Sequence, residues 1–250
     1  MKARTLLWAG AMAAMAALAC PANAQTEAPP AAAAKPAISA EDLAFGRFIA
    51  LIRAHLATGD ELVAKGEWGV AAQHFSFPTE EIYGVIRDQV RTYNTPPFDY
   101  ALRSLVRIVK GRDAKQFPKA RQKVDEALAV ADAGLKARQP AWPRFTLAVA
   151  IAVLKSAPDE YEDAVAKGRV VRPLGYQTAR GFVLQTDRMI EGVARELETA
   201  NASAMAAIRG SMSQIKASFA SVTPPKEITL TEGAFETAVG QAVQAAAPLL

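Results

Sequence analysis

The stretch from Arg53 to Phe75 limits the fold of this chain more than any other. It has the character of two helical segments joined at Lys65-Gly66, and it holds the only two histidines, His55 and His74. His55 lies ten residues before Lys65, and His74 lies nine residues after it. At about 1.5 Å of rise per residue, both would lie roughly 14 Å from the bend, at matching heights on neighbouring antiparallel helices. The spacing therefore predicts a helical hairpin in which two imidazoles face each other.

Both histidines are expected on the inward faces of their helices. The first helix is predicted from about Glu41 to Lys65, and the second begins near Glu67. Inward residues of the first helix recur at steps of three and four: Phe48, Ile52, His55, Gly59 and Leu62. In the second helix, Val70 and Phe77 share a side with His74. Pro78 is expected to interrupt this helix, and Thr79 to cap the segment that follows.

The rest of the chain predicts an all-α fold. Alanine, the best helix former, dominates the composition, and β-branched runs are scarce. Further amphipathic segments lie between proline and glycine signals, at residues 98–110, 114–138, 144–157, 173–199, 202–221 and 229–247. The sequence shows no repeat with a period of 20 to 50 residues, so it does not indicate a solenoid. We expect a helical bundle of seven to nine helices, built from antiparallel hairpins.

Several local signals predict where the later helices begin and end. Gly168 is expected to end a short acidic helix over residues 159–167, as glycine commonly does just after a helix. Pro173 is expected to open the next helix, because its missing N–H is not needed there. Thr229 with Glu232 has the spacing of a capping box for the final helix.

The first 24 residues have the character of a secretory leader. Lys2 and Arg4 precede a short apolar run, and the sequence Ala-Asn-Ala at residues 22–24 is typical of a cleavage site. Cleavage after Ala24 would leave residues 25–40, rich in alanine and proline, as a tether and residues 41–250 as a single helical-bundle domain. The alternative is a lipoprotein acylated at Cys20. Both interpretations predict export, and the mature chain holds no predicted transmembrane segment.

Composition excludes several classes of protein. Cys20 is the only cysteine and belongs to the leader, so the mature chain has no disulfide and no Cys-His nucleophile. A serine-nucleophile elbow, a glycine-rich phosphate loop and the H-E-x-x-H motif are all missing from the sequence. Without the leader the net charge is about +2, which is too small to indicate binding to nucleic acid. We therefore expect a protein that is not an enzyme and binds no nucleic acid.

The residues that remain for chemistry are candidate metal ligands. His55 and His74 would supply nitrogen, because neutral imidazole is the commonest biological metal ligand. Glu81 follows His74 by seven residues, and Glu160 and Tyr161 lie in the acidic segment that starts at Asp159. A site of this kind suits iron, copper or manganese better than a structural zinc. The alternative is that both histidines are core residues of a packed hairpin and that the acids only complement helix starts.

Two stretches resemble a known family. The segment from Glu160 to Phe182, with its Glu-Tyr, Ala-Val, Gly and Val pattern, resembles exported helical domains associated with bacterial high-affinity iron permeases. The segment around the histidines resembles such domains through a His-Leu…Gly…His…Pro…Glu-x-Tyr pattern. The resemblance implies a periplasmic helical domain that handles iron or another transition metal. Its implied ligands are His55, His74, Glu81, Tyr83, Glu160, Tyr161 and Tyr176. Gly175 departs from the pattern, because an acid is expected before Tyr176.

Two functions are therefore expected from different classes. The first is a periplasmic metal-binding accessory protein of a transport system, with iron preferred to copper or zinc and a membrane metal permease or another periplasmic protein as partner. The second is a structural or protein-interaction module without metal, in which His55 and His74 are core residues. A helical metallopeptidase of the imelysin type ranks last, because its Gly-x-His-x-x-Glu signature is missing.

Overall fold

The structure is a computed structural model and describes residues 37–250. The predicted leader, Cys20 and most of the predicted tether lie outside the described residues, so those interpretations stay predictions. Within the described part, Ile38–Leu250 forms one unit. The all-α prediction is confirmed, because helices carry this unit and its strands are limited to two of two residues each.

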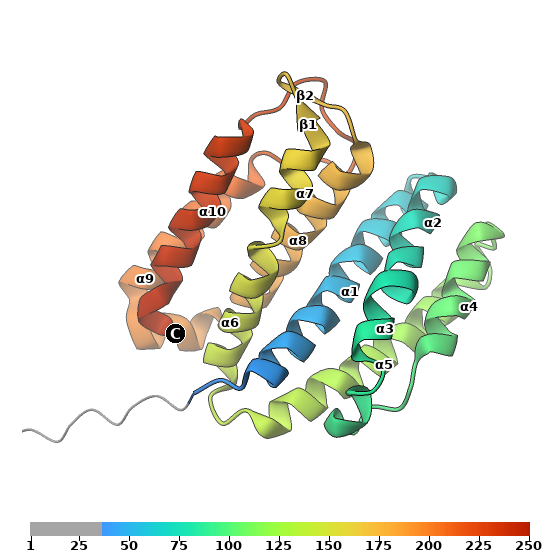
Figure 1. Cartoon of the computed structure of the whole chain (residues 1–250), viewed down its shortest axis with the longest axis horizontal. Helices are drawn as coiled ribbons and strands as arrows, with labels where there is room; N and C mark the ends of the chain where they lie inside the picture. Colours follow the sequence, from blue (N-terminus) through green and yellow to red (C-terminus); the bar gives the residue numbers. More distant parts are fainter. Residues whose placement is uncertain (1–36) are drawn as a thin grey trace, which may run out of the picture. The chain divides into compact units, whose positions relative to one another are not determined.

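Ten α-helices make up the described part of the chain (Figure 1). The first five are α1 (Ala40–Ala64), α2 (Trp68–Phe77), α3 (Tyr83–Ile86), α4 (Asp99–Lys110) and α5 (Phe117–Arg138). The second five are α6 (Trp142–Leu154), α7 (Ala157–Ala164), α8 (Pro173–Glu191), α9 (Ala194–Lys216) and α10 (Glu232–Ala246). A π-helix, η1 (Pro78–Ile82), joins α2 to α3, and two 3₁₀ turns are η2 (Val90–Tyr93) and η3 (Ala247–Leu249). The strands β1 (Val165–Ala166) and β2 (Arg169–Val170) form one small hairpin.

Helix α1 connects the two halves of the fold. It contacts α2 and α5 of the first half and α6 and α8 of the second half, and Figure 1 shows it between these two sets. The second half forms four rods that contact one another, in which α6 and α7 continue as one broken rod beside α8, α9 and α10. Ser39 caps α1, since its hydroxyl accepts from the Asp42 N–H at 3.1 Å.

The predicted helix end at Gly168 is wrong. Helix α7 already ends at Ala164, and Gly168 lies in the turn of the β1–β2 hairpin. Lys167 and Gly168 have φ angles of 50° and 75°. Positive φ at both central residues is the requirement of a type I′ turn, whose twist suits a two-residue hairpin. The glycine signal was correct, but it belongs to a strand connection.

Three other local predictions differ from the structure. The cap of the last helix is Thr231 rather than Thr229, because the Thr231 hydroxyl accepts from the Ala234 N–H at 3.3 Å. Pro78 interrupts the α-helix as predicted, because α2 ends at Phe77. It opens η1, which continues directly from α2, and Thr79 caps nothing.

The helix predicted from Pro173 to Thr199 is instead interrupted at Gly192 and Val193, between α8 and α9. The break predicted after Thr199 is present as a kink inside α9. Asn201 leaves helical geometry there, with φ −162° and ψ 92°, and its side-chain oxygen accepts from Ala204 N–H at 3.0 Å. Among the helices of residues 37–250, none is both long enough and apolar enough to cross a membrane.

Candidate functional site

The two histidines meet as their spacing predicts. Gly66, with φ 79°, closes the turn between α1 and α2, a conformation that glycine adopts without strain. The Nδ1 atoms of His55 and His74 are 3.4 Å apart, and the ring centroids are 5.7 Å apart. Both side chains are buried, with 2% and 1% exposure. The prediction of a helical hairpin with facing imidazoles is confirmed.

A chain of hydrogen bonds assigns the protons of this pair. The Gln177 Nε2 group donates to the Val222 carbonyl at 3.3 Å, which turns Gln177 Oε1 toward His74. Since Oε1 only accepts, His74 Nε2 carries a proton and donates to it at 3.1 Å. In a neutral imidazole the other nitrogen is then an acceptor, so His55 Nδ1 donates to His74 Nδ1.

This assignment leaves one lone pair without a partner. His55 Nε2 is buried and has no hydrogen-bond partner among residues 37–250. Burial lowers the pKa of His55 to about 3, and the nearby His74 lowers it as well. Burial also lowers the pKa of His74, against the opposing effect of its bond to Gln177. Both rings are therefore neutral near pH 7, which is the form that binds metals.

The lowered pKa values predict a pH-dependent stability. The unfolded state binds a proton at His55 below about pH 6.5, whereas the folded state binds it only near pH 3. Stability from the neutral ring is therefore complete above pH 6.5 and is lost as the pH falls toward 3. At pH 5.5 the loss from His55 alone is expected to be about 1.4 kcal/mol, and His74 adds to it.

Urea unfolding at pH 7.5 and pH 5.5 measures this loss. Burial raises the pKa of Asp60 and of Asp132, which stabilises the fold as pH falls, so the comparison needs a control. The control is the double variant His55→Gln with His74→Gln, which keeps those carboxyl groups and lacks the titrating rings. A pH difference equal in both proteins would contradict the assignment.

His55 also lines a pocket of about 560 Å³ that contains three carboxylates. Its ring lies between two phenyl rings. The Phe77 ring stacks on it at 4.5 Å between centroids, and Phe182 meets it edge-on at 5.6 Å. The acids lining the same pocket are Glu81, Asp159 and Glu160, and the bases are Arg47 and Lys155. Of the predicted ligands, the structure thus brings His55, Glu81 and Glu160 to one pocket, with His74 directly behind His55.

Glu160 is the most enclosed carboxylate of the pocket, while Glu81 and Asp159 are exposed. Burial raises the pKa of Glu160, and the charges of Asp163 and Asp159 raise it further against the opposing charge of Arg172. Within residues 37–250, no three His, Cys, Asp or Glu side chains lie close enough together to hold a metal ion as they stand. A cation in this pocket would therefore require the carboxylates to turn toward His55.

Tyr161 is not brought into this pocket. Its hydroxyl donates to the Leu230 carbonyl at 2.7 Å, and its ring stacks on Phe235 with centroids 4.4 Å apart. Burial raises its pKa to about 12, so the phenol stays protonated near pH 7. The hydroxyl of Tyr176 likewise lies 3.3 Å from the Ser218 and Ser221 carbonyls. Both tyrosines anchor loops to helices in this structure.

Tyr83 has a similar role. Its hydroxyl accepts from the Phe98 N–H at 3.1 Å, and its ring meets the Phe98 ring edge-on. The phenol therefore holds the start of α4 against α3, and it does not line the His55 pocket.

Gly175 has a packing reason for its departure from the expected acid. A Cβ atom at this position would lie 2.9 Å from the Glu160 carbonyl oxygen and 3.2 Å from the Ala164 Cβ. Helix α8 therefore begins in close contact with α7, and a larger side chain would force the two apart. The glycine lets the Glu160 segment pack against α8.

The sequence did not indicate Gln177, the residue that orients His74. It lies 103 positions after His74, in α8, and no local spacing connects the two. Its only signal was its polar side chain, next to Tyr176 in a segment that forms a largely buried part of α8. Phe182, one turn further along α8, was named only as the end of a motif and not as a wall of the pocket.

Comparison with known proteins supports this view of the fold. Residues 136–250 match the family model of the iron permease-associated 4-helix bundle domain. The match covers slightly less than half of the chain and spans α6 to α10, which form the four rods described above. The resemblance to helical domains associated with iron permeases is therefore confirmed. The chain matches no curated protein and no solved structure.

The matched part and the histidine hairpin contribute different residues to the site. Glu160 and Gln177 lie within the matched residues 136–250, whereas His55, His74 and Glu81 precede them. What the match shows is a helical module with an iron-transport association. The hairpin of α1 and α2 adds the imidazoles from outside that module.

Proposed function

We propose that this protein is a non-enzymatic accessory module of a membrane iron-transport system, which holds a metal cation in the pocket beside His55. Two observations support the proposal: the family match of residues 136–250, and the unpartnered, buried Nε2 atom of His55, a residue that lines an acid-lined pocket. The second observation carries it, because a buried acceptor without a partner costs about 1–3 kcal/mol and a cation would offset that cost.

The proposed ligands have distinct roles. His55 Nε2 is the nitrogen ligand, and Glu160 is the carboxylate nearest to being fixed by its surroundings. The exposed side chains of Glu81 and Asp159 would complete the site by rotating inward. Mixed imidazole and carboxylate ligands suit iron, with zinc and copper as competitors.

His74 has a supporting role in this proposal. Both of its nitrogens are engaged, Nε2 with Gln177 and Nδ1 with His55. His74 Nδ1 accepts a hydrogen bond from the His55 Nδ1–H group, so the free lone pair of His55 is the one on Nε2. Partners of this kind orient a metal-binding histidine, and their loss typically weakens metal affinity by about 10- to 100-fold. This differs from the expectation of two histidine ligands on one ion.

The cellular setting is also part of the proposal. The family description associates the domain with iron permeases, so the partner we propose is a membrane permease or a protein that travels with it. The leader-like residues 1–24 favour export, and we therefore place the protein in the periplasm. In that position it would hold the cation before it reaches the permease.

Metal titration by calorimetry tests the proposal. We expect one site for Fe²⁺ under anaerobic conditions, with affinity reduced by about tenfold or more in His55→Ala and in His74→Ala. Glu160→Gln is expected to weaken binding as well. The matched control is Glu162→Gln, because Glu162 is exposed on the same helix and does not line the pocket. Equal affinity in His55→Ala and wild type would contradict the proposal.

One observation favours the alternative of a metal-free interaction module. The chain from His55 through His74 and Gln177 to the Val222 carbonyl connects α1, α2 and α8 with the loop that follows α9. Such a polar network specifies how helices fit together without any ligand. In that case the titration detects no site-specific binding, and His74→Ala lowers only the stability.

A further inference from the structure

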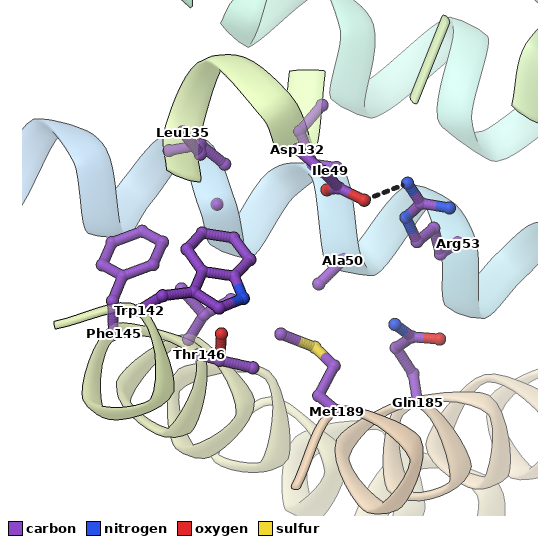
Figure 2. A pocket seen from close by; sticks show the side chains of 12 residues that line it. Ile49, Ala50, Arg53, Asp132, Leu135, Trp142, Phe145, Thr146, Gln185 and Met189 are labelled. Atoms are coloured by element: carbon purple, nitrogen blue, oxygen red, sulfur yellow. Dashed lines mark hydrogen bonds and ion pairs between the residues drawn. The ribbon is translucent and has the colours of Figure 1, made fainter. Parts of the chain in front are cut away.

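A second cavity lies where α1, α5, α6 and α8 meet (Figure 2). Its volume is about 140 Å³. Its apolar walls are Ile49, Leu135, Trp142, Phe145, Val149 and Met189. An apolar protein cavity of about 150 Å³ is large enough to bind benzene. The space therefore suits a molecule with about six to eight non-hydrogen atoms.

The cavity differs from a packing defect because polar groups face it without partners. The hydroxyl of Thr146 is buried and has no hydrogen-bond partner in the described part of the chain. The amide of Gln185, a residue only 7% exposed, makes no hydrogen bond within residues 37–250 either. Figure 2 shows both side chains pointing into the gap between α1 and the α6 and α8 helices. A ligand with one polar group would satisfy the Thr146 hydroxyl.

The charged residues at the edge of the cavity are already paired. The Arg53 Nη2 group donates to Asp132 Oδ2 at 2.5 Å, and Figure 2 shows this bond at the α5 side. An anionic ligand would have to displace Asp132, and a cationic one would face the guanidinium. The free groups, Thr146 and Gln185, are neutral and can both donate and accept.

We propose that this cavity binds a small, mainly apolar organic molecule with one neutral hydrogen-bonding group, of about the size of phenol. The apolar ring lies against Phe145, Val149 and Met189, and the polar group bonds to the unpartnered hydroxyl of Thr146. This site is separate from the His55 pocket. It does not depend on the metal function, because the two pockets have no lining residue in common.

Methyl NMR of the methionines in the full-length protein tests the proposal. Met189 lines the cavity, whereas Met205 and Met212 are buried in α9 and do not, so they serve as internal references. Titration with benzene, phenol and benzoate is expected to shift the Met189 methyl signal alone. One added hydrogen bond predicts that phenol binds about three- to tenfold tighter than benzene.

One variant separates the polar contact from the cavity itself. Thr146→Val keeps the volume and removes the hydroxyl, so it is expected to weaken phenol binding about three- to tenfold and leave benzene binding unchanged. Thr178→Val, a buried threonine of α8 outside the cavity, is the matched control. Equal binding of phenol and benzene, tighter binding of benzoate, or a Met189 signal that never moves would each overturn the proposal.

Discussion

Gly134→Ala is expected to destabilise the fold by about 3 kcal/mol or more. A Cβ atom at Gly134 would overlap the carbonyl oxygen of Tyr93 and lie 2.7 Å from its carbonyl carbon. The clash is with backbone, which cannot rotate away as a side chain does. Helix α5 and the η2 turn would therefore have to separate, and the packing between them would be lost.

The matched control for this substitution is Gly210→Ala. Gly210 lies on the exposed side of α9, and a Cβ there would meet nothing within 4 Å. Replacing glycine by alanine at such a helical site is expected to stabilise by about 0.5–1 kcal/mol. Urea unfolding of both variants measures the opposite signs. A Gly134→Ala protein as stable as wild type would show that α5 does not press against Tyr93.

Asp42→Ala is expected to cost about 2–4 kcal/mol. Asp42 is 4% exposed and accepts three hydrogen bonds, from the Tyr93 hydroxyl at 2.9 Å, Arg138 Nε at 3.1 Å and Gln139 Nε2 at 2.6 Å. The substitution leaves the Tyr93 hydroxyl buried without a partner, which is the costly outcome for such a group. Arg138 is 43% exposed and can return to water, so the loss stays below that of a fully buried ion pair.

Asp42→Asn separates the charge from the hydrogen bonds. Its side-chain oxygen can still accept from Tyr93, so we expect roughly half the loss of Asp42→Ala. Chemical denaturation at pH 7 measures both. If the two variants were equally stable, the hydrogen bond to Tyr93 would contribute nothing. If Asp42→Ala were as stable as wild type, the three hydrogen bonds to Asp42 would not stabilise the fold.

The substitutions at Gly134 and Asp42 act on one junction, in which Tyr93 contacts the start of α1 and α5. This junction helps to position the site. Tyr93 stacks on Phe45 of α1 with centroids 3.9 Å apart, bonds to Asp42 of α1 and presses its backbone against Gly134 of α5. The start of α1 is therefore fixed against α5. Because α1 is a continuous helix from Ala40 to Ala64, this contact also helps to set the position of His55, about three to four turns further along.

The hairpin was predictable because its signals are local. Gly66 marks the turn, and the periods of three and four place both histidines inward, so a rise of 1.5 Å per residue was enough to match their heights. The same reasoning misplaced Gly168, because a positive-φ glycine serves a helix end and a hairpin turn equally well. A hairpin turn forms instead of a helix end where the residues on both sides of the glycine pair as strands, as Val165 and Val170 do.

The pocket was predictable only in part. Glu81 and Glu160 were candidates by residue type, yet their meeting at His55 depends on how η1 and α7 pack against α1. Tyr161 was also a candidate by residue type. An inward position does not determine which cavity a ring faces, and Tyr161 packs on Phe235 of α10 instead. Gln177 could not be inferred, since only the tertiary fold brings α8 to His74.

The central claim is that His55 Nε2 is a free lone pair that accepts a cation. Because the chain has only two histidines, long-range ¹H–¹⁵N NMR of the imidazoles measures it directly. In the metal-free protein at pH 7.5, we predict protons on His55 Nδ1 and His74 Nε2. On adding Zn²⁺ as a diamagnetic substitute for Fe²⁺, the His55 Nε2 signal should shift strongly and the His74 nitrogens only slightly. A proton on His55 Nε2, or no shift at this atom with saturating metal, would contradict the account.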